Sequence, residues 1–325
     1  MKARKLKSGA WNVRITVGGQ TYSFTDPDRR QVMRIASAFA AECRENIANP
    51  PLHTCLEDFI EEHREMLSPS TIRSYAGIAR TIKRRNPTVA NKRLVAISDK
   101  DVQAIIRPLK TPKTQRNYVN FIQVATGKKF SVKYKQKKPK EIAVPTDLEV
   151  LGMLEVFKDT EMEVPIMLGA YGGLRRGEIS ALTIQDVDGD YITIDKDMIL
   201  NDDREWVIKP PKTATSNRTI LLPHMVTERI RAKGYVTTLK PNEISNRMRR
   251  KMHALCVEPA YSFHSLRHYS ASYLHAKGIP DAYIMARGGW ASPSVMRKVY
   301  RHALSDKARE MEEKAVSAFQ IPFQD

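Results

Sequence analysis

Several features that would assign this chain to a common class of protein are missing from its sequence. The 325 residues contain no long apolar run, no signal peptide with an apolar core and no lipidation motif, which argues against a membrane protein. A glycine-rich phosphate loop of the Walker type is also missing, so an ATP-driven mechanism has no support.

Cysteine is scarce as well. Cys43, Cys55 and Cys256 lie far apart and lack the spacing of metal ligands. An odd number of cysteines in a chain without a secretion signal is typical of reduced thiols in a cytoplasm. We therefore expect neither a metal site nor a cofactor, and we interpret each cysteine as a small packing residue.

Positive charge is what the chain has in excess. It carries 54 Lys+Arg against 36 Asp+Glu, a formal net charge of +18. An excess of that size predicts a polyanionic partner, and nucleic acid is favoured over a membrane surface. Hydrophobic residues make up 42% of the chain, enough for real cores, and its length predicts two or three compact units.

The first fifty residues predict a small sheet backed by one helix. Residues 11–17 alternate large apolar and polar side chains, as a half-buried strand does, and the alternation resumes over 20–25 after a double glycine typical of a hairpin turn. Residues 29–47 carry apolar side chains at helical spacing. We expect two or three strands and a helix in 1–50.

Residues 52–127 predict a bundle of four short helices. The first covers about 54–66, and Ser70 is expected to cap the second. The third and fourth are expected to have capped starts at Ser98 and Thr111. Between residues 128 and 140 there are seven lysines and no acid. We interpret this segment as a solvated linker whose lysines can follow a phosphate backbone.

Residues 141–325 predict the largest unit, mostly helical with a small antiparallel sheet. The segments with a clear pattern are helices at 146–158 and 161–171, strands at 191–194, 205–208 and 218–222, and helices from there to the end. The expected fold class is therefore α+β and multidomain, with a sheet-plus-helix domain, an all-helical domain and a mostly α catalytic domain.

Two junctions in this last unit carry basic residues suited to phosphate chemistry. Arg175 lies in the Gly-Gly-Leu-Arg-Arg-Gly-Glu-Ile junction between two predicted helices, where its planar fork can bind a phosphate bidentately. Glu178 either buttresses an arginine or is an acid favoured at a helix N-terminus. Lys212 lies between two predicted strands, where a hairpin-tip lysine can donate a proton or simply be solvated.

Two further motifs follow near the end of the chain. In Ser-Phe-His-Ser-Leu-Arg-His, His264 and Arg267 share a helix face and can both donate to phosphate oxygens, whereas His268 points elsewhere and is interpreted as structural. Trp290 can donate through its indole N–H, and Tyr300 follows it by ten residues. Taken singly, each residue is more typical of a core or a surface turn.

As a set, these motifs resemble the tyrosine recombinases, specifically the phage and mobile-element integrases. The order and spacing of the elements agree with the family pattern. Gly288 stands where that pattern usually has leucine, and Trp290 where it usually has histidine. The resemblance implies a catalytic site of six side chains: Arg175, Lys212, His264, Arg267, Trp290 and Tyr300.

The resemblance also implies a role for each of these six residues. Tyr300 would attack the phosphate, giving a 3′-phosphotyrosine and a free 5′-hydroxyl, and Lys212 would protonate the leaving oxygen. The two arginines would clamp the non-bridging oxygens, His264 would assist there or in proton transfer, and Trp290 would donate to the same oxygens. Because the covalent bond conserves the free energy of the phosphodiester, rejoining needs no ATP. No metal is needed because the arginines supply the charge that a metal would otherwise bring.

By the same resemblance, 1–50 is an arm-type DNA-binding domain, 52–127 a core-binding domain, 128–140 an interdomain linker and 141–325 the catalytic domain. The implied partners are double-stranded DNA at core and arm attachment sites, further copies of the chain in a tetramer, and accessory factors such as an excisionase or a host DNA-bending protein. The implied location is the cytoplasm of a bacterial host.

Two other functions remain open at this point. A non-catalytic DNA-binding regulator would keep the basic surface but not the full set of six side chains. A type IB topoisomerase-like enzyme would share the chemistry and relax plasmids without any site requirement. An apolar stripe over 304–319 predicts a further helix, which packs either on its own domain or on a neighbouring protomer.

Overall fold

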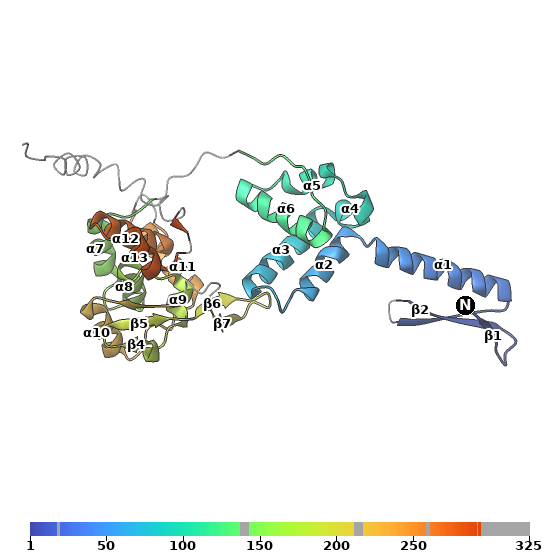
Figure 1. Cartoon of the computed structure of the whole chain (residues 1–325), viewed down its shortest axis with the longest axis horizontal. Helices are drawn as coiled ribbons and strands as arrows, with labels where there is room; N and C mark the ends of the chain where they lie inside the picture. The colour runs from blue at the N-terminus through green and yellow to red at the C-terminus, as the bar shows by residue number, and fades with distance from the viewer. Residues whose placement is uncertain (18–19, 137–142, 211–216, 258–260, 291, 294–325) are drawn as a thin grey trace, which may run out of the picture. The chain divides into compact units, whose positions relative to one another are not determined.

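The computed structural model describes residues 1–17, 20–136, 143–210, 217–257, 261–290 and 292–293 (Figure 1). The chain divides into two compact units, Met1–Lys138 and Pro139–Asp325. Both units combine helices with small antiparallel sheets, so the expected α+β class is confirmed. Among the described residues, no helix has both the length and the apolarity needed to cross a bilayer.

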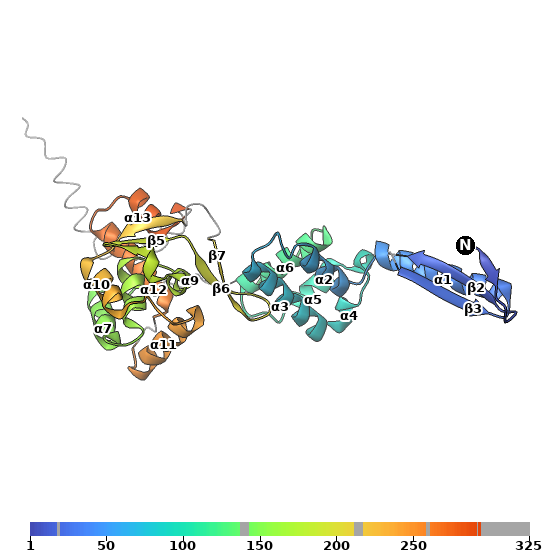
Figure 2. The same cartoon turned by 90° about the horizontal axis from the view of Figure 1, so that it is seen from below.

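The chain begins with a three-stranded antiparallel sheet in the order β1-β2-β3. Its strands are β1 (Ala3–Lys5), β2 (Trp11–Val17) and β3 (Gln20–Asp26), and helix α1 (Arg29–Ala48) packs on one face (Figure 2). Because successive strand residues point to opposite faces, Val13 and Ile15 of β2 face α1 together. The core is small and consists of these two residues with Val32, Ala36 and Ala40.

A helical bundle follows. It contains α2 (Leu52–Glu62), α3 (Pro69–Arg85), α4 (Pro87–Ala90), α5 (Asp99–Ile106) and α6 (Pro112–Thr126). Proline stands in the first turn of three of them, where its missing N–H costs nothing. Ser70 is therefore not the cap of α3: the helix already begins at Pro69, and Ser68 occupies the N-cap position. The four-residue helix α4 was not predicted, because four residues show no periodicity.

The lysine-rich segment is not simply a solvated linker, and that expectation needs correction for residues 128–136. Phe130, Val132 and Tyr134 pack against the core of the helical bundle. The ammonium groups of Lys128 and Lys135 donate to the carbonyl oxygens of residues 94 and 109, respectively. Alternate side chains are apolar here, so the segment lies along the bundle as an extended chain.

The second unit surrounds a small sheet with helices. Its sheet has the order β4-β5-β8, and β6 pairs with β7 in a separate hairpin. The strands are β4 (Val187–Asp188), β5 (Tyr191–Ile194), β6 (Asp197–Leu200), β7 (Trp206–Lys209) and β8 (Arg218–Leu221). The helices are α7 (Asp147–Phe157), α8 (Glu163–Tyr171), α9 (Arg176–Ala181), α10 (His224–Lys233), α11 (Pro241–Ala254), α12 (Phe263–Ala276) and α13 (Asp281–Gly288).

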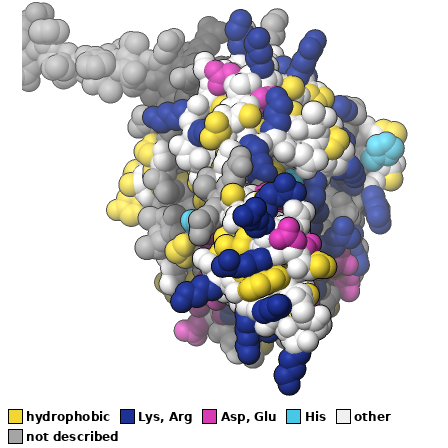
Figure 3. Space-filling model, turned by 90° about the vertical axis from the view of Figure 1, so that its right-hand side faces the viewer, with side chains coloured by type: hydrophobic (Ala, Val, Ile, Leu, Met, Phe, Trp, Pro, Cys, Tyr) yellow, Lys and Arg dark blue, Asp and Glu magenta, His cyan; other side chains and the backbone are white. Residues whose placement is uncertain are grey.

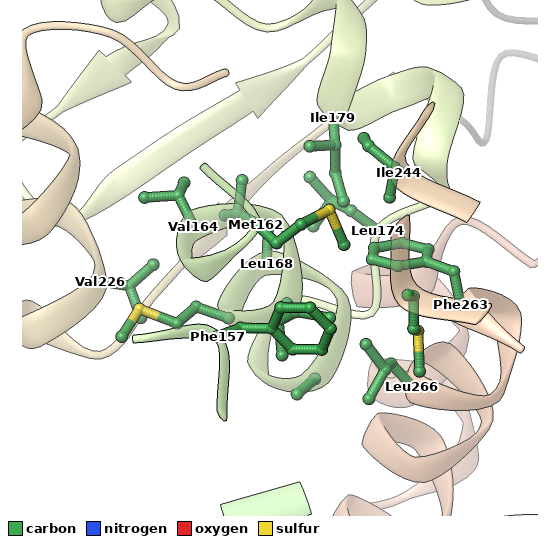
Figure 4. Packing of buried hydrophobic residues seen from close by; sticks show 14 of the residues in the cluster. Phe157, Met162, Val164, Leu168, Leu174, Ile179, Val226, Ile244, Phe263 and Leu266 are labelled. Atoms are coloured by element: carbon green, nitrogen blue, oxygen red, sulfur yellow. The ribbon is translucent and has the colours of Figure 1, made fainter. Parts of the chain in front are cut away.

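Helix α8 is the core element of this unit. It packs against α7, α10 and α12, and every residue of Glu163–Ala170 is buried. A helix that is apolar on all sides is stable only when it is surrounded. Figure 4 shows Leu168 of α8 among Phe157 of α7 and Leu266 of α12. The buried C-terminal end of α8 leads directly into the junction that carries Arg175.

Candidate active site

The junction between α8 and α9 places Arg175 at the N-cap of α9. Gly173 has a φ of 65°, in the left-handed region that glycine adopts at little cost, and it turns the chain sharply before Arg175. The guanidinium of Arg175 donates from Nη1 to Oε1 of Glu178 at 2.6 Å and from Nη2 to the carbonyl of Gly289 at 2.9 Å. Arg175 is therefore fixed from two sides while part of its side chain stays exposed.

Glu178 is the anion that organises this part of the site. It is 3% exposed, and its carboxylate accepts from the backbone N–H and the side chain of Arg175 and from Nη1 and Nη2 of Arg218 at 3.2 and 3.0 Å. Burial alone would raise the pKa of Glu178, but the hydrogen bonds and charges of Arg218 and Arg175 lower it overall. Glu178 therefore has both of the roles that the sequence left open: it supports an arginine, and it is the acid at the helix N-terminus.

Arg267 lies one turn into α12 and is the largest fully buried side chain described. It is 1% exposed, and its Nη1 donates to the carbonyl of Gly173 at 2.6 Å. Within the described part of the chain, its Nε and Nη2 have no hydrogen-bond partner. Burial, with the neighbouring charges of Arg175 and Arg218, lowers the pKa of Arg267 to about 9, although Glu178 opposes this effect. A cation with two unused donors in such a place favours an anionic ligand.

His264 lies three residues before Arg267 on the same helix, with its ring edge-to-face on His268 at a centroid distance of 4.6 Å. The residue as a whole is exposed. The surrounding atoms nevertheless desolvate it and, with the charges of His268, Arg267 and Arg175, lower the pKa of His264 to about 4. The imidazole is therefore neutral near pH 7, and a bound anion would raise this pKa again.

Trp290 completes the described group. It follows α13, whose C-cap Gly289 has a φ of 64°, and its backbone N–H donates to the carbonyl of Met285 at 3.0 Å. The indole ring covers the guanidinium of Arg267, with 4.2 Å from Cζ to the ring centroid. Four of the six predicted side chains, Arg175, His264, Arg267 and Trp290, are thus brought together around one buried positive charge.

The part of the chain that contains this group matches a known protein family. Residues 153–307 match the model of the phage integrase family. This region is therefore a phage integrase family domain. A search of curated proteins found no match.

Solved structures of recombinases share the fold. The Tn1549 transposon integrase in complex with transposon right-end DNA superposes with a TM-score of 0.67 at 16% identity, covering 81% of this chain and 99% of that one. A lambda integrase dimer bound to a COC′ core site gives a TM-score of 0.58 at 16% identity, with coverage of 92% and 94%. A lambda integrase tetramer bound to a Holliday junction gives 0.58 at 14%, with coverage of 91% and 94%.

Two of the predicted recombinase residues, Lys212 and Tyr300, lie outside the described residues. The strands on either side of Lys212, β7 and β8, are described, and β8 begins with Arg218. Around the site and elsewhere in the described ranges, no group of three or more His, Cys, Asp or Glu side chains is arranged to hold a metal ion.

Arg218 is a residue of the site that was not predicted. Besides its two bonds to Glu178, its Nε donates to the carbonyl of Arg287 at 2.7 Å. Arg287 in turn donates to the carbonyls of Leu221 and Tyr171 at 2.8 and 3.0 Å. Arg218 belongs to the same Pro-Lys-Thr-x-x-Ser-x-Arg motif as Lys212. Its alternation with the buried Ile220 of β8 could have indicated that it points inward.

Arg218→Met is expected to lower the free energy of unfolding of the second unit by about 3–5 kcal/mol, because it leaves the Glu178 carboxylate buried without its main partner. Arg247→Met is the matched control, since Arg247 bonds Glu161 at 2.8 Å with both side chains 47% exposed; its cost should stay below about 1 kcal/mol. Hydrogen exchange of α8 peptides along a urea series measures both. Equal losses in the two variants would contradict the structural role of Arg218.

Proposed function

We propose that the chain is a site-specific DNA recombinase, an integrase that cuts and rejoins DNA to integrate or excise a phage or mobile element. The observation that carries this proposal is Arg267. Its buried guanidinium has two donors without a partner in the described residues, and Arg175, His264 and Trp290 lie around it. A DNA phosphodiester supplies both the negative charge and the acceptor oxygens that this group lacks.

In the proposed reaction, Arg267 and Arg175 hold the non-bridging oxygens of the phosphate and stabilise the charge that develops on them. His264, neutral in the free protein, can donate one hydrogen bond to the same oxygens. The positions of the two guanidinium groups are set before DNA binds, by hydrogen bonds to Gly173, Glu178 and the carbonyl of Gly289. Such preorganised donors need no rearrangement at the transition state.

Tyr300 and Lys212 supply the bond-making groups in this proposal, on the strength of the sequence motifs. The Tyr300 hydroxyl gives up its proton to solvent, and its oxygen attacks phosphorus and forms the 3′-phosphotyrosine while the bond to the 5′-oxygen breaks. Lys212 gives that leaving oxygen a proton, so that a free 5′-hydroxyl results. The reverse attack by a 5′-hydroxyl, on the same or another strand, restores the phosphodiester.

The proposal is tested by trapping the covalent intermediate. The full chain is incubated with a randomised library of nicked duplexes, from which a short 5′-hydroxyl fragment diffuses away after cleavage. SDS-stable complexes are isolated, and their DNA is sequenced. We expect one enriched sequence, linkage through the 3′-phosphate and a modified peptide that contains Tyr300. Linkage at a 5′ end, or cutting without any adduct, would overturn the mechanism.

We further propose DNA-binding roles for the first unit. Residues 1–50 would bind arm-type sites, and 52–127 would bind core sites. The basic segment up to residue 140 would follow the phosphate backbone of the DNA. Lys and Arg side chains are spread over the face seen in Figure 3. Each of them that meets a phosphate releases counterions, so binding should weaken steeply with salt.

Removing residues 1–51 is expected to spare cleavage of core sites and to weaken integration. The small sheet-plus-helix core and the bundle core are separate clusters of buried residues, so the bundle can keep its own packing. Adduct yield on isolated core sites and integration into arm-containing DNA are compared for the two proteins. Loss of all core binding would mean that the two roles are assigned to the wrong segments.

Assembly is part of the same proposal. A lambda integrase forms a tetramer on a Holliday junction, and we propose that four copies of this chain assemble on DNA in the cytoplasm of a bacterial host. An excisionase and a host DNA-bending protein are the proposed accessory factors. The predicted apolar stripe over 304–319 lies outside the described residues. In this proposal it packs either on its own protomer or on a neighbouring protomer of the tetramer.

A further inference from the structure

The two departures from the recombinase motif, Gly288 and Trp290, are linked by geometry. A Cβ placed on Gly288 would lie 2.7 Å from both Cε3 and Cζ3 of Trp290 and 3.3 Å from Cδ2. Carbon atoms do not approach to 2.7 Å without a bond, so the indole ring would have to move. Gly288 is buried and its φ is not positive, so its backbone would accept another residue. The Trp290 ring is therefore what requires glycine here.

The place that this glycine leaves open decides where the ring lies. Trp290 packs beside Ala271 of α12 and Ile284 of α13, with its backbone tied to Met285. One face of the ring then covers Arg267 at 4.2 Å. Apart from this contact, one hydrogen bond to Gly173 orients the guanidinium among the described residues. A displaced ring would leave the bond to Gly173 as the directed contact that orients the guanidinium among the described residues.

We propose that Gly288 is a positioning residue for Arg267: because it lacks a side chain, the Trp290 ring can lie over the guanidinium and hold its plane. Trp290 then acts on the site through its ring face, whatever its indole N–H contributes. The catalytic consequence rests on the proposed recombinase function, whereas the placement of the ring does not. Replacing Gly288 should therefore be tolerated only when Trp290 is replaced as well.

The placement is tested first without DNA. The full chain is labelled with 5-fluorotryptophan, and its three tryptophans give three ¹⁹F resonances, of which the one missing from Trp290→Phe belongs to Trp290. Gly288→Ala and Gly288→Leu should shift that resonance alone. Gly152→Ala and Gly152→Leu are the matched controls, since Gly152 is an exposed glycine of α7 with no atom within 4 Å of an added Cβ. An unmoved Trp290 resonance in the Gly288 variants would overturn the proposal.

The consequence is tested on trapped core DNA. Gly288→Leu should slow adduct formation by about 10-fold, the effect expected for losing a desolvated cation–π contact, and Gly152→Leu should not slow it. In a Trp290→His background, adding Gly288→Leu should change the rate by less than about 2-fold, because no indole ring remains to be displaced. If the rate losses of Gly288→Leu and Trp290→His multiplied in the double variant, the proposal would be overturned.

If the unaltered chain forms no adduct, the recombinase function fails, while the fluorine result still decides the placement of the ring. Gly288→Ala replaces Gly288→Leu in these experiments where the leucine variant does not fold.

Discussion

Tyr300→Phe is expected to bind core DNA with unchanged affinity and to form no covalent adduct. The substitution removes one oxygen atom and keeps the aromatic ring, so packing is preserved while the attacking group is lost. Removing the nucleophile of a covalent mechanism costs on the order of 10⁴-fold or more in rate. Adduct formation is measured on SDS gels with a nicked core duplex, and affinity is measured by gel shift on the same DNA.

Tyr283→Phe is the matched control for this experiment. Tyr283 lies on α13 in the same unit and is 70% exposed, so its variant should form the adduct at the rate of the unaltered chain. Tyr300 lies outside the described residues, and its assignment comes from its position ten residues after Trp290. An SDS-stable complex formed by Tyr300→Phe would show that another residue attacks the phosphate.

Arg267→Lys is expected to reduce the cleavage rate by about 10²–10³-fold although it conserves the charge. The guanidinium donates from Nη1 to the carbonyl of Gly173, and its Nε and Nη2, which have no partner among the described residues, lie in the same plane and are the donors proposed to bind the phosphate. A lysine ammonium is a point charge on a flexible stem and cannot occupy these positions together. It also gives up the planar contact with Trp290. Losses of this size are typical when a preorganised donor to a transition-state oxygen is removed.

Arg267→Lys should affect the stability of the free protein less than it affects the cleavage rate. In the free protein two of the Arg267 donors have no partner among the described residues, so within that part of the structure the replacement loses the bond to Gly173 and the ring contact. Arg176→Lys is the matched control, because Arg176 is exposed, adjoins Arg175 and bonds only the Ser245 hydroxyl at 2.7 Å in the described structure. Single-turnover cleavage rates compare the variants. A near-normal rate for Arg267→Lys would count against the phosphate clamp.

Much of the local structure could be predicted because its causes are local. The helix starts at Ser98 and Thr111 follow from hydroxyl side chains that can accept a hydrogen bond from the backbone N–H three residues later. Both of these N-caps are present in the structure. Strands β2 and β3 follow from the alternation over residues 11–17 and 20–25. Strand β4 has only two residues and no pattern to detect, and β6 is a partly exposed hairpin strand without alternation. Neither was predicted for that reason.

The candidate site shows the same division between local and distant causes. Order and spacing along the chain were enough to nominate Arg175, His264, Arg267 and Trp290, since motifs are local, and the structure places them side by side. The catalytic roles of these residues, like those of Lys212 and Tyr300, remain proposals for the experiments above.

What the sequence determined by itself is the α+β organisation, the polyanionic class of partner and the motifs of a recombinase, because charge, periodicity and spacing are properties of neighbouring residues. Only the tertiary structure decided that Arg218 holds Glu178 forty residues away, that residues 128–136 pack on the bundle, and that Gly288 makes room for an indole ring over Arg267. Each of these depends on which surfaces meet when distant segments pack. That outcome follows from the shape and burial of the whole domain and leaves no periodic trace in the sequence.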